Sequence, residues 1–194
     1  MDEIYYMRNI FVILKNIFTQ NFYVSERLFL YELCSPLSIV SDAKIEKATD
    51  TSISDVVCFQ NKDMVGIYRN LLKNGDTGYQ AYLGEKCVHV SFTRPYTKET
   101  NKAFPHSGYT YFLKENEVYV HYCETAPDAR GKNVYPYVLT KIAEEYPNKT
   151  LVLFIYKDNW ASIKGVEKAG FRKRCTLHVL ILLGLKFTRM INDK

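Results

Sequence analysis

Residues 117–145 decide the fold, and their sequence is EVYVHYCETAPDARGKNVYPYVLTKIAEE. The segment Glu117–Thr125 is rich in Val, Tyr and His and stops just before Pro127, which predicts a β-strand. From Val134 onward, apolar side chains recur at helical spacing, which predicts an amphipathic helix. Pro136 falls in the first helical turn, where its missing N–H group is not needed. The stretch therefore predicts a strand that leads into a helix through a short turn.

The turn between this strand and this helix is Ala129-Arg130-Gly131-Lys132-Asn133. A helix N-terminus presents unpaired backbone N–H groups and the positive end of the helix dipole. Arg130 and Lys132 add two cations, and Gly131 lets the backbone approach an anion closely. We therefore expect the turn to bind a phosphate group. The alternative is an ordinary turn with solvated cations, because the spacing matches neither a Walker A loop nor a G-x-G-x-x-G turn.

The rest of the chain places this unit in a mixed sheet. Thr150–Tyr156 is a continuous apolar run, which is typical of a buried strand parallel to residues 117–125 across a helical crossover. Asn159 as N-cap and Gly170 as stop predict a helix between them. The other elements that we expect are strands at Arg27–Cys34, Gly78–Leu83, Lys86–Thr93 and Tyr109–Leu113, a helix at Lys62–Leu72, one or two strands within 171–190, a polar connection at 38–54 and a loop at 94–107. The fold class is therefore α/β (mixed α+β), with a mostly antiparallel sheet, one parallel strand–helix–strand unit and flanking helices.

Length and composition indicate one domain with an N-terminal addition. The chain has 194 residues, 47% of them hydrophobic and 24% charged, which favours a packed core over disorder. We assign residues 25–194 to the domain and residues 1–24 to an amphipathic helical extension, because apolar residues recur at helical spacing over 4–18. The extension packs on the domain or on a second subunit, giving a homodimer; the alternative is peripheral contact with a membrane surface. Its charged residues argue against a signal peptide or a spanning helix.

The cysteines and the net charge bound the compartment and the partners. The five cysteines are odd in number and far apart, and none forms a C-x-x-C pair. This pattern predicts a reducing, cytoplasmic setting without a disulfide framework or a metal site. The net charge of +5 suits an anionic small molecule about as well as weak nucleic-acid contact. We expect no nucleic-acid partner, because no basic run or RNA-reading motif accompanies the charge.

Two segments together resemble the GCN5-related N-acetyltransferase (GNAT) family over about the C-terminal half of the chain. The family has a Q/R-x-x-G-x-G/A turn, which Pro127–Asn133 resembles. It also shows an Asn, a small residue and a Gly-Phe ending, which Asn159, Ala161 or Ser162, and Gly170-Phe171 resemble. Tyr135-Pro136 followed by residues 162–171 is similar to a bacterial branch linked to surface-polysaccharide and amino-sugar genes.

The resemblance implies acetyl-coenzyme A as co-substrate, with no metal, and a set of residues that bind it. Its pyrophosphate would lie on the turn, its pantetheine arm between parallel strands that part, and its thioester carbonyl near the amides of residues 123–125. The implied cofactor-binding residues are Cys123, Thr125, Arg130, Gly131, Lys132, Asn133, Val134, Tyr135, Asn159 and Ser162.

Three positions depart from the family pattern. Asp128 stands where the turn has Gln or Arg, and a carboxylate there repels phosphate unless it points away. Asn133 replaces the second Gly, and Asn tolerates the left-handed backbone conformation better than most residues. Val166 stands where many relatives have the Tyr that protonates the departing thiolate, so this chain needs another acid or none.

The proton acceptor has two candidates on the central strand. Acyl transfer to an amine needs a neutral amine, and Glu124 is the first candidate base because it lies nearer the expected thioester, with His121 second. Simple alternation places the two side chains on opposite faces of the strand. The plainer alternative is a solvated glutamate and a half-buried, hydrogen-bonded histidine.

The sequence therefore predicts an acetyl-coenzyme A-dependent N-acetyltransferase. We expect direct transfer of the acetyl group to a primary amine, with an amino sugar or another small amine as acceptor. The alternative is a non-catalytic acyl-coenzyme A-binding or regulatory module of the same fold, and a nucleic-acid-associated protein is a weaker third hypothesis.

Overall fold

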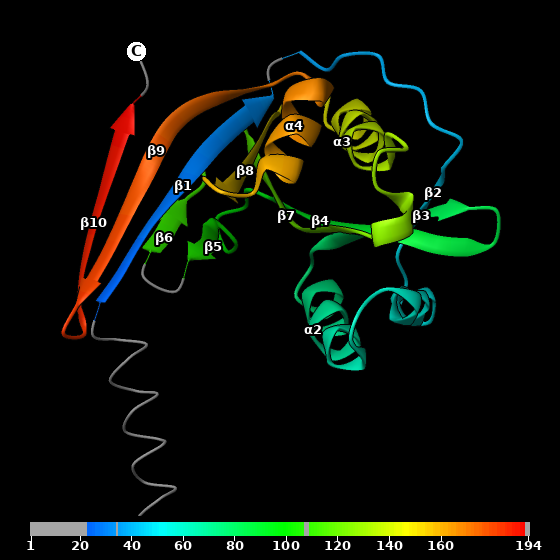
Figure 1. Cartoon of the computed structure of the whole chain (residues 1–194), viewed down its shortest axis with the longest axis horizontal. Coiled ribbons are helices and arrows are strands. Elements are labelled where there is room, and N and C mark those ends of the chain that lie inside the picture. The colour runs from blue at the N-terminus through cyan, green and yellow to red at the C-terminus, as the bar shows by residue number, and fades with distance from the viewer. Residues whose placement is uncertain (1–22, 34, 107–108, 193–194) are drawn as a thin grey trace, which may run out of the picture.

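The computed structural model describes residues 23–33, 35–106 and 109–192 (Figure 1). The helix expected over 4–18 lies outside these residues, as does most of the 1–24 extension, whereas Tyr23 and Val24 belong to the first strand. Within the described residues, no helix is long and apolar enough to span a membrane.

The described elements follow one another along the chain with short connections. Their bounds are β1 Tyr23–Leu33, β2 Lys44–Lys47, η1 Ser52–Cys58, α2 Lys62–Lys73, β3 Thr77–Leu83, β4 Lys86–Pro95, β5 Lys102–His106, β6 Tyr109–Phe112, β7 Glu117–Thr125, η2 Pro127–Ala129, α3 Val134–Glu145, β8 Thr150–Tyr156, α4 Trp160–Ala169, β9 Phe171–Leu182 and β10 Leu185–Asn192.

Most strands form one sheet with the order β10-β9-β1-β8-β7-β4-β3-β2, and β5 and β6 form a separate hairpin. Neighbouring strands of the large sheet are antiparallel, except that β7 and β8 are parallel across α3. This confirms the mixed, mostly antiparallel sheet with one parallel strand–helix–strand unit.

Strand β1 is first in the described chain but lies deep inside the sheet. It pairs with β8 on one side and with β9 on the other. The Tyr31 hydroxyl on β1 donates a hydrogen bond of 3.0 Å to Glu167 Oε1 on α4, which follows 136 residues later. The N-terminal strand therefore closes a sheet whose neighbouring strands come from the C-terminal quarter of the chain.

Each face of the sheet has its own cover (Figure 1). Helices α3 and α4 lie on one face, where Val138 and Ile142 pack in the main core cluster with Val120 and Leu153. On the other face, α2 and η1 cover the β3–β4 region, and Tyr68 packs with Phe92. The β5–β6 hairpin covers the same face further along, over Leu30 and Tyr119 among others. Strand β7 runs between these two covers.

Two of the predicted connections contain short strands. The 38–54 connection includes β2 and the start of η1, and the 94–107 loop includes β5. Both predictions were wrong for the same reason: β2 is stabilised by pairing with β3, and β5 by pairing with β6, rather than by an alternating pattern of their own. Strands β7 and β8 have the predicted bounds.

Candidate active site

Strands β7 and β8 part from each other halfway along their length. Their parallel pairing joins Glu117–Tyr119 to Thr150–Val152. Beyond these residues, β7 remains paired with β4 as far as Thr125, and β8 remains paired with β1 as far as Tyr156. An opening between parallel strands at their C-terminal ends is a usual place for a ligand in an α/β sheet.

The turn that follows β7 has an unusual backbone. Gly131 has a φ of 81° and Asn133 a φ of 60°, so two left-handed residues flank Lys132. Asn133 is the N-cap residue of α3, and its Oδ1 accepts a hydrogen bond of 2.7 Å from Lys168 Nζ on α4. The expectation that Asn tolerates this conformation is confirmed. Alternating handedness at a helix N-terminus turns successive N–H groups toward one point and makes an anion-binding concavity.

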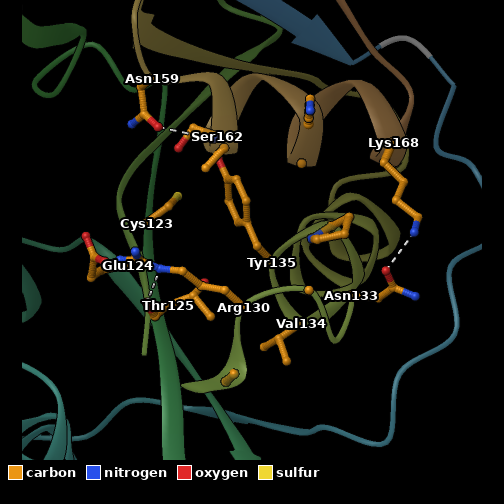
Figure 2. A pocket seen from close by; sticks show the side chains of 16 residues that line it. Cys123, Glu124, Thr125, Arg130, Asn133, Val134, Tyr135, Asn159, Ser162 and Lys168 are labelled. Atoms are coloured by element: carbon orange, nitrogen blue, oxygen red, sulfur yellow. Dashed lines mark hydrogen bonds and ion pairs between the residues drawn. The ribbon is translucent and has the colours of Figure 1, made fainter. Parts of the chain in front are cut away.

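A cavity of about 460 Å³ lies where β7, the turn, α3 and α4 meet (Figure 2). Its lining residues are Cys123, Glu124, Thr125, Ala129, Arg130, Gly131, Asn133, Val134, Tyr135, Pro136, Asn159, Ala161, Ser162, Lys164, Gly165 and Lys168. Three of them carry positive charge, and the single carboxylate among them, Glu124, is paired with Arg130 at 3.2 Å. The lining therefore suits an anionic ligand.

The cavity brings together all but one of the cofactor-binding residues expected from the sequence. The exception is Lys132, which does not line it; its carbonyl oxygen instead accepts a hydrogen bond of 3.3 Å from Ser41 Oγ. The Asn159 Oδ1 accepts a hydrogen bond of 3.1 Å from the Ser162 N–H, so this predicted N-cap orders the start of α4 beside the cavity.

Sequence reasoning missed the cavity residues on the body of α4. Lys164, Gly165 and Lys168 line the cavity with Ala161, and positions 161, 165 and 168 recur at the spacing of one helix face. That spacing was a usable signal once Ala161 or Ser162 was assigned to the site.

Asp128 does not oppose an anion in the cavity. Its carboxylate forms an ion pair with Lys86 Nζ at the β3–β4 hairpin, and this pair lowers the pKa of Asp128 below its usual value. Asp128 is not among the residues that line the cavity. The carboxylate points away, as the sequence required for a phosphate-binding turn.

Tyr135 occupies the middle of the site. Figure 2 shows its side chain rising from α3 toward α4, where a Cβ atom on Gly165 would lie 2.6 Å from the Tyr135 ring. Burial raises the pKa of Tyr135 well above its usual value and that of Cys123 to about 11, so both remain protonated at neutral pH. Cys123 is therefore not a thiolate nucleophile. Val166 is fully buried in the core behind α4.

A bulge in β7 changes which side chains share a face. Tyr122 has a φ of 49°, and the register between β4 and β7 shifts there, so that His121 lies opposite Phe92 and Glu124 opposite Val90. Val90 and Phe92 both point to the face covered by α2. His121 and Glu124 therefore point to that face as well, and the prediction of opposite faces was wrong because one extra residue was inserted.

His121 belongs to a buried polar group contributed by three strand regions. Its side chain is 8% exposed, and its Nε2 lies 3.3 Å from Asp76 Oδ2. Asp76 accepts two hydrogen bonds of 2.7 Å from Arg94. Nε2 has no hydrogen bond within the described part of the chain. Burial lowers the pKa of His121 despite Asp76, so the imidazole is neutral at neutral pH.

Glu124 lies at the border of this polar group and the cavity. Its side chain is 43% exposed, and Arg130 Nη2 donates a hydrogen bond of 3.2 Å to Glu124 Oε1. The Arg130 Nε also donates to the Thr125 carbonyl oxygen at 3.3 Å. The side chain of Arg130 therefore joins the turn to the end of β7.

Solved structures share this architecture, although sequence comparison is silent. Neither a protein-family model nor a curated protein sequence matches the chain. A GNAT-family acetyltransferase from Colwellia psychrerythraea aligns with a TM-score of 0.61 and 14% identity over 86% of this chain and 60% of that one. A conserved protein of unknown function from Staphylococcus epidermidis aligns with a TM-score of 0.59 and 10% identity over 88% and 67%.

A tandem GNAT protein from the clavulanic acid biosynthesis pathway aligns with a TM-score of 0.51 and 7% identity over 87% of this chain and 55% of that one. The chain thus spans about three fifths of the length of the Colwellia protein and little more than half of the tandem protein. At such low identities the similarity shows the fold, and the fold is that of the GNAT acetyltransferases.

Proposed function

We propose that this protein is an N-acetyltransferase that uses acetyl-coenzyme A and acetylates a primary amine. The observation that carries the proposal is the cavity at the left-handed turn, where a helix N-terminus, three cationic side chains and the opening between β7 and β8 meet. An anionic diphosphate joined to a narrow, amide-bearing arm matches both parts of this site.

The described residues fit coenzyme A. A Cβ atom on Gly131 would meet nothing within 4 Å, so the backbone at the turn is open to an approaching phosphate. Arg130, Lys164 and Lys168 supply the positive charge, and the free N–H groups of residues 123–125 on the cavity side of β7 are placed to pair with amides of the arm or with the acyl carbonyl. When bound, acetyl-coenzyme A supplies an activated acyl group whose thiolate can leave.

His121 is the proton acceptor in this proposal, and Glu124 has a separate role. A general base must be deprotonated at working pH, and the lowered pKa of His121 meets this condition. Asp76 lies 3.3 Å from Nε2 and stabilises the imidazolium that forms. Glu124 is already paired with Arg130. His121 takes the proton that the amine releases as the new C–N bond forms and the C–S bond breaks.

The acceptor in this proposal approaches from the face of β7 that carries His121. An amino sugar is the first candidate, because the sequence resembles a branch linked to surface-polysaccharide and amino-sugar genes, and another small amine is the second. The four described cysteines are free thiols, which supports the cytoplasm as the compartment. A homodimer and a membrane contact through residues 1–22 remain predictions.

Two measurements test the proposal. Acetyl-coenzyme A at 100 times its dissociation constant should stabilise the protein by about 2.7 kcal/mol in thermal unfolding. Incubation of the protein and acetyl-coenzyme A with a panel of amines should release a free thiol for at least one amine. The absence of any stabilisation would contradict coenzyme A binding itself.

A non-catalytic acyl-coenzyme A-binding module is the second candidate function. The buried Val166 favours it, because this α4 position holds no side chain that could protonate a thiolate. Stabilisation by acetyl-coenzyme A without thiol release for any amine would select this function over the enzyme. The acidity of a free thiol, with a pKa of about 8.5, lets the thiolate leave without such help, so we place the enzyme first.

A further inference from the structure

The residue at the β7 bulge has a strained backbone and a large exposed ring. Tyr122 is one of three non-glycine residues with positive φ in the described part of the chain. This conformation is unfavourable for a bulky residue and persists only where the surrounding structure enforces it. The side chain is nevertheless 46% exposed. Such strain does not serve to bury the ring, which points to a role at the surface of the site.

Neighbouring rings fix the position of Tyr122. The Tyr68 ring on α2 meets it edge to face, with ring centroids 5.9 Å apart and planes at 82°. The Phe92 and His121 rings lie at 6.5 and 5.4 Å, also at steep angles. Edge-to-face contacts of this kind stabilise an aromatic group in one orientation. Part of the phenol therefore stays open to solvent while the rest is held in place.

The bulge also places charge and a proton acceptor on either side of this ring. His121 precedes Tyr122, Glu124 follows two residues later, and both share the face covered by α2. Behind His121, Asp76 is neutralised by Arg94 through two hydrogen bonds. Glu124 is the more exposed carboxylate, and Arg130 is its partner on the cavity side. The exposed ring thus lies between a carboxylate and a neutral imidazole.

We propose that Tyr122, Glu124 and His121 form the acceptor site and that its ligand is a protonated primary amine on a carbon skeleton that lies against the Tyr122 ring. An ammonium group is attracted to the face of an aromatic ring and to a nearby carboxylate. A neutral or anionic acceptor gains neither interaction. The inference rests on the proposed function, because it assigns the amine of that reaction.

The arrangement orders the events at the amine. Glu124 and the ring attract the ammonium form that predominates in water, and His121 takes one proton from it. The neutral amine then attacks the acyl carbon, the C–N bond forms and the C–S bond breaks. Tyr122 is a binding residue in this sequence and transfers no proton.

The test compares Tyr122→Leu with Tyr122→Phe, using Phe187→Leu on β10 as a matched control that also replaces an exposed aromatic residue. Tyr122→Leu removes the ring and should raise KM for the amine roughly 3- to 30-fold, with the affinity for coenzyme A unchanged. Tyr122→Phe keeps the ring and should stay within about twofold of wild type. Phe187→Leu should have no effect on KM.

A direct binding measurement makes the test independent of turnover and of how the variants fold. Glucosamine, spermidine and cadaverine are titrated by calorimetry into wild-type protein saturated with coenzyme A, each beside its N-acetylated form. At least one amine should bind, and its N-acetylated form should bind at least about tenfold more weakly, because the charge is lost.

Each other outcome overturns the inference. Equal binding of an amine and its N-acetylated form, binding of none of the three amines, or an unchanged KM in Tyr122→Leu would each remove the ammonium site. Normal coenzyme A binding and thiol release in those same experiments would leave the proposed function intact. Failure of wild-type protein to bind coenzyme A would instead contradict the proposed function.

Discussion

The two faces of β7 are built from different materials. On the α3 face, the cavity depends on backbone: a left-handed Gly131 and Asn133, a helix N-terminus, and strand amides left free where β7 and β8 part. On the α2 face, the proposed acceptor site depends on side chains: His121, Asp76 and Arg94 from three strand regions, with Tyr122 and Glu124 around the bulge. The same strand thus presents a main-chain site and a side-chain site back to back.

The difference explains what each site can recognise. Backbone amides and a helix terminus bind any phosphate-bearing ligand of suitable shape, so one ligand can be shared by many proteins. Side chains set a specific pattern of charge and aromatic surface, so the acceptor can differ from one chain to another. Changes on the α3 face should therefore affect coenzyme A affinity, and changes on the α2 face should affect turnover or the amine.

His121→Gln should have the largest effect and should be confined to the α2 face. Loss of a general base typically lowers kcat by about 10²- to 10⁴-fold. The affinity for coenzyme A, measured by calorimetry, should stay within about twofold of wild type, because His121 does not line the cavity. A variant with full kcat would remove His121 as proton acceptor, and a large loss of coenzyme A affinity would show that the two faces are not separate.

Gly131→Val should act on the α3 face alone. A β-branched residue at a φ of 81° is strained by about 1–3 kcal/mol, so coenzyme A affinity should fall roughly 5- to 150-fold. Gly131→Asn is the matched control, because Asn adopts positive φ more readily and should lose less affinity. An unchanged affinity in Gly131→Val would contradict the phosphate-binding turn.

The two histidines of the site region sharpen the comparison through pH. His89 on the α3 face is fully buried between Thr125 Oγ1 at 2.7 Å and Ser91 Oγ at 2.6 Å. Burial lowers the pKa of His89 to about 3. Between that value and about 6.5, the unfolded chain binds a proton that the folded chain does not, so the free energy of unfolding falls as pH falls.

The expected slope is about 1.4 kcal/mol per pH unit between pH 6 and 4.5 for this one group. Urea unfolding of wild type and His89→Gln at several pH values measures it. The variant should lose about that much of the wild-type slope while keeping its kcat at neutral pH within a few-fold. Identical slopes in the two proteins would show that His89 is protonated alike in the folded and unfolded states.

Glu124→Gln should have the smallest effect. The exposed pair between Glu124 and Arg130 is worth about 0–1 kcal/mol, so coenzyme A affinity should change by less than about fivefold. The KM for the amine should rise by a few-fold, because the carboxylate that attracts the ammonium is lost. Glu85→Gln at the β3–β4 hairpin is the charge-matched control. A loss of kcat comparable with that of His121→Gln would move the proton acceptor to Glu124.

The main-chain site was largely predictable from sequence because its signals are local. The β7–turn–α3 unit, the buried β8 and the N-cap of α4 each depend on residues within about one turn or one strand of one another. Asn133, Gly131 and Asn159 could be assigned from their own conformational preferences. The cationic α4 residues Lys164 and Lys168 were missed, because their relevance depends on how α4 packs over the turn.

The side-chain site was not predictable in the same way. The bulge at Tyr122 depends on the register of β4 against β7, and no residue type in VYVHYCET specifies an inserted residue. Asp76 and Arg94 reach His121 only because the sheet aligns three distant segments. The short strands β2 and β5 were missed for a related reason, since pairing partners elsewhere in the chain stabilise them.

The position of β1 has a consequence for how the chain is made. Its partners β8 and β9 lie near the other end of the sequence, so during synthesis β1 waits with both hydrogen-bonding edges open until those strands have left the ribosome. Contacts between such distant segments slow folding and leave strand edges exposed to wrong pairing. We therefore expect nascent chains that stop before Phe171 to depend on chaperones and to aggregate when these are absent.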